Sequence, residues 1–391
     1  MKWLALILFV NDFGRTLVTV FIPLYFLINL HASYFFVGLS IAIIVGTSAV
    51  FQAVGGALAD TWGRKKSMIT STGARSFVIA ALATYSFFSP SLIIVVFLFA
   101  ISEALNGIFV TSTNAMVADI VQSGRRVEAY GIYRVSINLG YTLGAFFGGL
   151  LAYFSESFIT WTILTFATFF IIFFTIEETN PVVSSRFQLK TIISAARDRT
   201  LLSFALVSIG AGMIGNSLGT SLTLYTTQYV GITKSQVGFL NSLNGIIVTL
   251  FQYGFARFAQ KRRLSRVIAV SALVQGTGFL LVGFSNTFLL LGLTIVLITI
   301  GEMLQAPTGT AFSSIIAPES QRGEYIGFYN WGLNSGMALS PLVGGFLLTD
   351  ISTSPRDTWI VIFLVGILCT LGYLGVGRIA KRALPNLQSI I

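Results

Sequence analysis

The sequence predicts an all-helical integral membrane protein with twelve membrane-spanning helices. Of its 391 residues, 54% are hydrophobic and only 10% are charged, whereas a soluble domain carries about 25% charged residues. Long apolar runs recur along the whole chain, and one spanning helix needs roughly 20 such residues. Short segments of alternating polarity, which are typical of a membrane β-barrel, are not seen.

The expected spans follow one another with short connections. The first is too long for a cleavable signal peptide, and no small-residue cleavage site follows it. Several exceed 20 residues, which allows a helix to tilt or to extend beyond the bilayer core. The spans are residues 3–30, 34–61, 67–88, 91–120, 129–153, 158–176, 201–229, 235–258, 267–285, 288–316, 325–349 and 358–378.

The positions of the basic residues orient these spans. Lys and Arg collect in the cytoplasmic connections of membrane proteins. Here they follow every even-numbered span and precede the first, whereas the opposite side carries only Lys234 and Arg356. We therefore expect both termini to be cytoplasmic and the protein to lie in the plasma (inner) membrane. The net charge of +10 is then a topology signal, and no nucleic-acid partner is expected.

The chain repeats itself at an offset of about half its length. Phe51-Gln52 recurs as Phe251-Gln252, and Glu103 recurs as Glu302. One offset held through six helices predicts two six-helix halves of equal orientation, which suits alternating access around a central site. The expected parts are an N-terminal half (1–176), a cytoplasmic linker (177–200) and a C-terminal half with a short cytoplasmic tail (201–391).

The loop after the second span carries a specific motif, whose residues are Gly56, Asp60, Gly63, Arg64 and Lys65. This segment resembles the signature loop of the major facilitator superfamily. The resemblance implies an inner gate that latches the halves when the carrier opens outward, with Asp119 as the expected partner of Arg64. A small residue at Gly56 would allow close helix approach. A simple positive-inside anchor is the alternative.

The second-half copy of this loop departs from the pattern. Gly254 and Arg262 remain, but Phe258 stands where the first half has Asp60. Any latch in the second half must therefore be weaker than the first or built differently.

The fifth span has glycines at helical spacing, namely Gly131, Gly140, Gly144, Gly148 and Gly149. This resembles the glycine-rich motif of the drug–proton antiporters in the superfamily, although Ala145 stands where that family has proline. Glycines four residues apart let helices pack backbone to backbone. We expect these to be helix-packing glycines, with Gly144 and Gly148 at a tight contact. A purely structural role is the alternative.

Four ionisable residues and one amide are expected inside the spans. Asp12 and Arg15 share one face of the first helix, while Glu103 and Glu302 lie in the fourth and tenth. A lipid-facing charge costs roughly 2.5–3.5 kcal/mol at the bilayer centre, so these groups must face a wet cavity or one another. By the resemblance, helices one, four, seven and ten line the central cavity. Asn216 in the seventh helix joins this expected substrate and proton site.

Glu103 or Glu302 is the expected proton carrier, because a desolvated carboxyl group favours its neutral form. Many family members have arginine at the position of Glu103. Structural hydrogen bonds for the two glutamates, and a buried ion pair between Asp12 and Arg15, are the alternatives.

Two further arginines fall inside the spans. Arg75 and Arg134 are expected to snorkel to the inner interface, or else to join the inner gate.

The predicted function is proton-coupled efflux of small amphipathic compounds by alternating access, as in the twelve-helix drug–proton antiporters. The alternatives are a proton–solute symporter or a facilitator for a sugar, peptide or organic acid, and a non-transporting receptor or scaffold on the same fold. The expected partners are a small-molecule substrate, protons as the coupling ion and the lipid bilayer, and a monomer is expected. With one cysteine and one histidine, and no phosphate-binding Walker loop, we expect no enzyme activity, cofactor or metal site.

Overall fold

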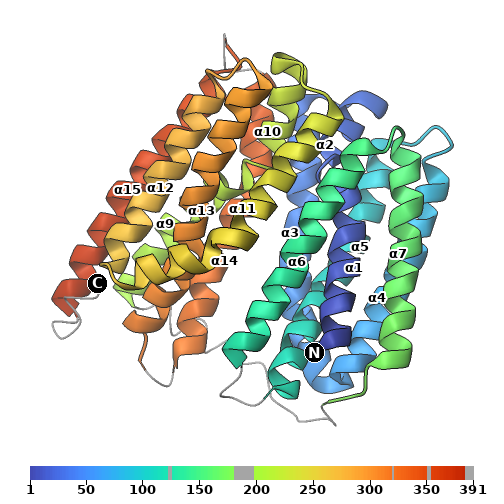
Figure 1. Ribbon diagram of the computed structural model, residues 1–391, viewed down its shortest axis with the longest axis horizontal. Helices are drawn as coiled ribbons and strands as arrows, with labels where there is room; N and C mark the ends of the chain where they lie inside the picture. The colour runs from blue at the N-terminus through green and yellow to red at the C-terminus, as the bar shows by residue number, and fades with distance from the viewer. Residues whose placement is uncertain (122–125, 180–197, 319–320, 350–353, 384–391) are drawn as a thin grey trace. The chain divides into compact units, whose positions relative to one another are not determined.

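The computed structural model describes residues 1–391 except 122–125, 180–197, 319–320, 350–353 and 384–391, so most of the predicted linker lies outside the described residues. Every regular element of the described part is a helix (Figure 1). The first half contains α1 (Lys2–Thr19) with α2 (Ile22–Leu24) and the π-helix η1 (Tyr25–Asn29), then α3 (Tyr34–Trp62), α4 (Arg64–Tyr85), α5 (Leu92–Ile120), α6 (Arg126–Leu150) and α7 (Phe154–Thr175). The second half contains α9 (Arg199–Asn216) with α10 (Thr220–Tyr225) and the π-helix η3 (Thr226–Val230), then α11 (Lys234–Gln260), α12 (Leu264–Val282), α13 (Phe288–Ile316), α14 (Arg322–Thr349) and α15 (Asp357–Ala383).

The helix pairing of the first half recurs in the second, which confirms the predicted fold class of two pseudo-symmetric six-helix halves. In the first half α1 packs on α6 and α7, and α4 packs on α5 and α7. In the second half the equivalent helices make the same contacts, α9 with α14 and α15, and α12 with α13 and α15. The chain divides into two compact units, residues 1–187 with 233–246, and residues 188–232 with 247–391.

Eight of the described long helices have the length and apolar composition needed to cross a membrane. The other four, α4, α6, α11 and α14, are more polar because part of their polar surface packs against other helices. On α4, for example, Ser67, Ser71, Thr72, Arg75 and Ser76 are all buried. Large apolar side chains lie on the outside instead, such as Ile93 at 81% exposure and Phe174 at 76%. These outer faces match the hydrocarbon core of a bilayer.

The connections are short and locally capped. Ser33, Ser91 and Thr287 each accept a hydrogen bond from a backbone N–H in the first turn of α3, α5 and α13. Gly63 alone separates α3 from α4, with a φ of 101°, a conformation that glycine adopts without the steric cost of a side chain. The two helices of the motif loop therefore meet at a sharp corner, and this corner positions the charges that flank it.

Candidate functional site

A buried charge pair joins α1 to α5 in the first unit. The Arg15 Nε and Nη2 atoms donate to the two carboxylate oxygens of Glu103, each at 2.9 Å. Glu103 is 2% exposed, whereas the Arg15 side chain is 32% exposed. Two parallel hydrogen bonds of this kind are among the stronger polar contacts in proteins. Glu103 is therefore held by a positive charge that remains partly accessible.

Arg75 on α4 lies beside this pair and is 1% exposed. Its Nη1 atom donates to the Oδ1 atoms of Asn11 and Asn106, both at 2.8 Å, and its Nε atom donates to Ser102 Oγ at 3.2 Å. Its Nη2 atom is 3.6 Å from the Glu103 carboxylate. Arg75 thus binds side chains from α1 and α5 at once, and it holds three helices together.

This arrangement overturns the prediction that Arg75 snorkels to the inner interface or joins the inner gate. Arg75 is three turns from the start of α4, about 16 Å along the helix axis, so its side chain cannot reach the interface. A sequence signal was present, because Asn11, Ser102 and Asn106 are polar residues in otherwise apolar spans. Arg134 is exposed on α6 and is not part of this cluster.

Asp12 adds a second carboxylate to the cluster. It is half-buried on α1 and is within electrostatic range of Arg15, Arg75 and Glu103. The alternative of an Asp12–Arg15 ion pair is not found among the ion pairs of the described residues, where Arg15 pairs with Glu103 through its Nε and Nη2 atoms. With all four groups ionised, the two carboxylates balance the two guanidinium groups. A proton added to either carboxylate would leave a net positive charge.

The other predicted glutamate lies in a different setting. Glu302 on α13 is exposed and lines a pocket of about 180 Å³ within the second unit. In the same pocket the Gln275 side-chain amide of α12 donates to Gln305 Oε1 of α13. Tyr329 and Met337 of α14 and the glycines Gly212 and Gly215 of α9 complete its walls. Glu302 therefore does not repeat the buried environment of Glu103.

The two settings are nevertheless related by the sequence repeat. Gln275 and Gln305 occupy the repeat positions of Arg75 and Asn106, and each pair is joined by a hydrogen bond between equivalent helices. The second half has kept the contact and lost the charge. A buried cluster of four charged groups in one unit and an amide-lined pocket with a single carboxylate in the other are suited to different chemistry.

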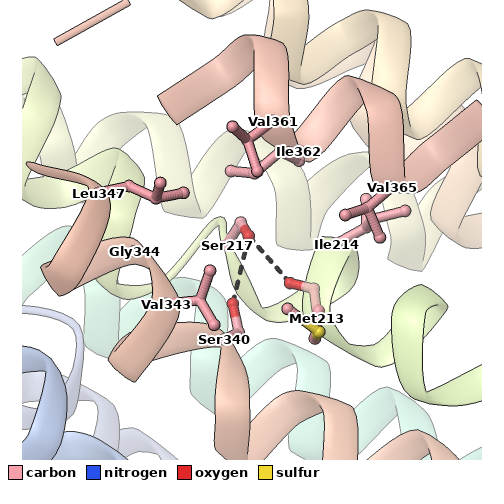
Figure 2. Close-up of a pocket in the computed structure, with 10 residues that line it drawn as sticks. All are labelled: Met213, Ile214, Ser217, Ser340, Val343, Gly344, Leu347, Val361, Ile362 and Val365. Carbon is pink, nitrogen blue, oxygen red and sulfur yellow. Dashed lines mark hydrogen bonds between the residues drawn. The ribbon is translucent and has the colours of Figure 1, made fainter. Parts of the chain in front are cut away.

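Asn216 was predicted to face the substrate or proton path. Its side-chain amide donates to the Met337 carbonyl oxygen of α14 at 2.8 Å, a contact that joins α9 to α14, and the role in the path stays a prediction. Nearby, Figure 2 shows the Ser217 hydroxyl 3.2 Å from the Ser340 hydroxyl and 2.9 Å from the Met213 carbonyl oxygen. The gap around these serines measures about 20 Å³, which leaves room for one water at most. It is too small to be a substrate site.

The charged groups of the motif loop meet at the ends of α3, α4 and α5. The Arg64 guanidinium donates to Asp60 Oδ1 at 2.5 Å and to Asp119 Oδ2 at 3.1 Å. The backbone N–H groups of Arg64, Lys65 and Lys66 donate to the Glu178 carboxylate at 2.7, 3.3 and 3.2 Å.

The sequence analysis did not include Glu178 in the network around the motif loop. The first turn of a helix leaves backbone N–H groups without helical partners, and Gly63, which precedes α4, has no side chain to bond them. The acceptor for these N–H groups is therefore a residue distant in the sequence. Nothing in the sequence indicated that it would be Glu178, which follows α7.

The glycines of α6 divide into three groups. A Cβ atom on Gly140, Gly144 or Gly148 would lie 2.5–2.7 Å from a backbone oxygen of α1. One on Gly149 would lie 3.1–3.2 Å from the backbone at the start of α11. The expectation for Gly131 is wrong as far as the described residues reach, because none of their atoms lies within 4 Å of the position its Cβ would take.

The sequence analysis assigned the close approach of α3 to a neighbouring helix to Gly56, but Gly55 makes it. A Cβ on Gly56 would meet only Thr111, at 3.7 Å, whereas one on Gly55 would lie 2.6 Å from the Ile108 Cα atom. Gly107 makes the reciprocal approach, 2.7 Å from the Ser48 carbonyl oxygen. The sequence reasoning missed both, since neighbouring glycines on one helix do not indicate which of them faces the partner.

Removal of the Arg64 side chain is expected to loosen the gate without preventing membrane insertion. Partly exposed ion pairs contribute up to about 1 kcal/mol each, so Arg64→Ala should raise accessibility near the gate about fivefold. The measurement is maleimide labelling of a cysteine at Ser67, which is 1% exposed beside the gate, in a Cys369→Ser background. Lys66→Ala is the matched control, since only the backbone of Lys66 contacts Glu178. Equal labelling of both variants would contradict a latch.

Comparisons with known proteins agree with this architecture. The Major Facilitator Superfamily model matches residues 4–263 and 201–387. The chain is 26% identical to the uncharacterized MFS-type transporter YttB of Bacillus subtilis (strain 168), covering 95% of this chain and 94% of the relative. It is 24% identical to a Na(+), Li(+), K(+)/H(+) antiporter of Planococcus maritimus, covering 75% and 77%. It is 22% identical to the multidrug resistance protein MdtH of Yersinia enterocolitica, covering 81% and 79%.

A solved structure supports the fold. The crystal structure of a peptide transporter POT in complex with sulfate superposes with a TM-score of 0.78 at 16% identity, covering 97% of this chain and 94% of the other. Relatives of this kind are transporters of small molecules embedded in membranes, and they are not enzymes. The chain therefore belongs to the Major Facilitator Superfamily and is a multi-pass membrane transporter.

Proposed function

We propose that this transporter exports small amphipathic compounds in exchange for protons, by alternating access. The observation that carries the proposal is the Asp12–Arg15–Arg75–Glu103 cluster, in which two carboxylates and two guanidinium groups lie inside membrane-spanning helices. Ionisable groups at this depth are costly unless they serve transport or are fully paired. The names of two relatives, a multidrug resistance protein and a cation/H(+) antiporter, favour efflux and proton exchange.

Glu103 is the proposed proton carrier. Arg15 is the group whose contacts change when Glu103 gains a proton. Loss of the Glu103 charge would break the two hydrogen bonds from Arg15 and leave Arg15 free to turn toward Asp12, one turn away on α1. Arg75 would stay in place, because Asn11 and Asn106 hold it independently of Glu103. A proton drives the conformational cycle only if it binds one state more tightly than the other. The exchange of partners by Arg15 supplies such a difference.

The pocket in the second unit is the proposed binding site for the polar end of the substrate. Gln275 and Gln305 offer amide groups, Met337 offers an adaptable apolar surface, and Glu302 offers a negative charge. A pocket with a few polar groups on apolar walls suits a small amphipathic molecule. Glu302 was expected to carry the proton together with Glu103, and its proposed role is instead to bind the substrate.

We further propose that both termini lie in the cytoplasm of a plasma-membrane monomer, so that the Arg64 network forms the inner gate. Direction of transport separates efflux from the symporter alternative. Everted vesicles made acidic inside should accumulate a substrate while their lumen becomes less acidic, and substrates would first be sought by growth of a transporter-deleted host on a compound panel. Proton and solute movement in the same direction would establish symport instead. Absence of flux for every compound would favour a receptor.

Glu302→Gln is expected to weaken transport of a cationic substrate and to spare a neutral analogue. Loss of a hydrogen bond to a charged group costs about 1.5–3 kcal/mol. The KM for the cation should therefore rise about tenfold or more. The measurement is KM and kcat for one cationic and one neutral compound of similar shape in proteoliposomes. An equal loss for both compounds would indicate that Glu302 acts in the cycle rather than on the substrate.

A further inference from the structure

A basic groove lies in the second unit where α11 ends and α12 begins. It measures about 620 Å³. Four exposed cationic residues line it, and Lys381 at the end of α15 is close enough to feel the charges of two of them, Arg263 and Arg266. The four lining cations are Lys261, Arg262, Arg263 and Arg266.

The equivalent loop of the first half provides acidic partners for its own arginine. There, Arg64 bonds Asp60 and Asp119. In the second half Phe258 occupies the position of Asp60, and the Arg262 guanidinium lies over the Phe258 ring, 5.4 Å from its centroid. No ion pair formed among the described residues involves any of the four cations. Their mutual repulsion would be relieved by an external anion.

The rest of the groove is apolar, which indicates what kind of anion fits. Val267 and Leu304 are buried at 7% and 6% exposure, while Val270 and Phe258 are 49% and 52% exposed. A free inorganic anion would gain nothing from these walls. A phospholipid would gain from both parts, because its headgroup carries the charge and its acyl chain covers the apolar surface.

We infer that this groove binds an anionic phospholipid, whose phosphate takes the place that Asp60 occupies beside Arg64 in the first half. In the first half Arg64 pairs with a carboxylate four residues earlier, and in the second half we assign that role to the phosphate of a membrane lipid. The binding itself does not depend on the direction of transport or on the coupling ion. The proposed function and this inference can therefore fail separately.

The test is thermal unfolding of the full-length protein in detergent with short-chain phosphatidylglycerol, phosphatidylcholine or inorganic phosphate. A ligand that binds only the folded state raises the unfolding temperature. We expect phosphatidylglycerol alone to do so. Arg262→Gln/Arg266→Gln should weaken its binding roughly 30-fold, given the contribution of each basic residue near an anionic lipid. Arg199→Gln, an exposed arginine of the same unit that does not line the groove, is the matched control and should bind normally.

A second variant tests the replacement directly. Phe258→Asp places a carboxylate four residues before Arg262, the spacing of Asp60 and Arg64 in the first half. It should stabilise the protein without lipid and reduce the response to phosphatidylglycerol. Equal stabilisation by phosphatidylcholine or by inorganic phosphate would overturn the inference. So would a full response in either groove variant, with folding checked by circular dichroism and size exclusion.

Discussion

Gly144→Leu is expected to abolish transport, and Gly131→Leu on the same helix is expected to be tolerated. At Gly144 a new Cβ would lie 2.6 Å from the Phe13 carbonyl oxygen and 2.8 Å from the Thr16 Cβ atom of α1. Both are too close for the helices to keep their present distance. Overpacking of this kind commonly costs about 1–3 kcal/mol and sometimes more, and here it displaces the helix that carries Asp12 and Arg15.

Gly131 provides the matched control because it lies on the same helix and no atom of the described residues lies within 4 Å of its Cβ position. Leucine there also replaces a poor helix former with a good one. Both variants would be compared for membrane insertion, unfolding temperature in detergent and substrate flux in proteoliposomes. Full flux in Gly144→Leu, or equal losses in both variants, would show that the contact between α1 and α6 does not matter for function.

Glu103→Gln is expected to destabilise the protein by about 3–5 kcal/mol, the usual cost of removing one partner from a buried ion pair. The substitution leaves Arg15 and the fully buried Arg75 without the carboxylate that lies 2.9 and 3.6 Å from their nitrogens. The amide of glutamine preserves the size of the side chain but not its charge. Stability would be measured by thermal and denaturant unfolding in detergent.

The double variant Arg15→Gln/Glu103→Gln separates charge from packing. Removal of both partners is far less costly than removal of one, so the double variant should recover much of the lost stability. Glu302→Gln serves as a second control, because Glu302 is exposed and its loss should change stability little. If the double variant were as unstable as Glu103→Gln, the cost would lie in packing rather than in an unpaired charge.

The fold could be predicted from the sequence because the patterns that indicate it extend over long stretches of the chain. The apolar spans and the repeat each extend over tens of residues, and the details of side-chain packing hardly alter them. The assignment of partners was less predictable. Arg15 was known to share a face of α1 with Asp12, yet its contacts depend on how α5 turns toward α1. The packing of α5 on α3, where Gly55 and Gly107 make the closest approach, contributes to that orientation, and the sequence does not reveal which side these glycines face.

The equivalence of Glu103 and Glu302 illustrates the same limit. Their positions match in the repeat, and this match predicted matching roles. The environments differ because the two arginines beside Glu103, Arg15 and Arg75, are replaced by Gly215 and Gln275 at the repeat positions of the second half. Residues on neighbouring helices thus decide whether a glutamate lies in a charge cluster or in an open pocket.

The central claim, that Glu103 carries the coupled proton, is tested most directly by proton movement in proteoliposomes when substrate is added. Wild type, Glu103→Gln and Glu302→Gln would be compared across pH at saturating substrate. We expect wild type and Glu302→Gln to move protons in the same ratio to substrate, and Glu103→Gln to bind substrate without moving protons. If Glu103→Gln kept the wild-type proton-to-substrate ratio, Glu103 would be structural, and the proton path would have to be sought at Asp12.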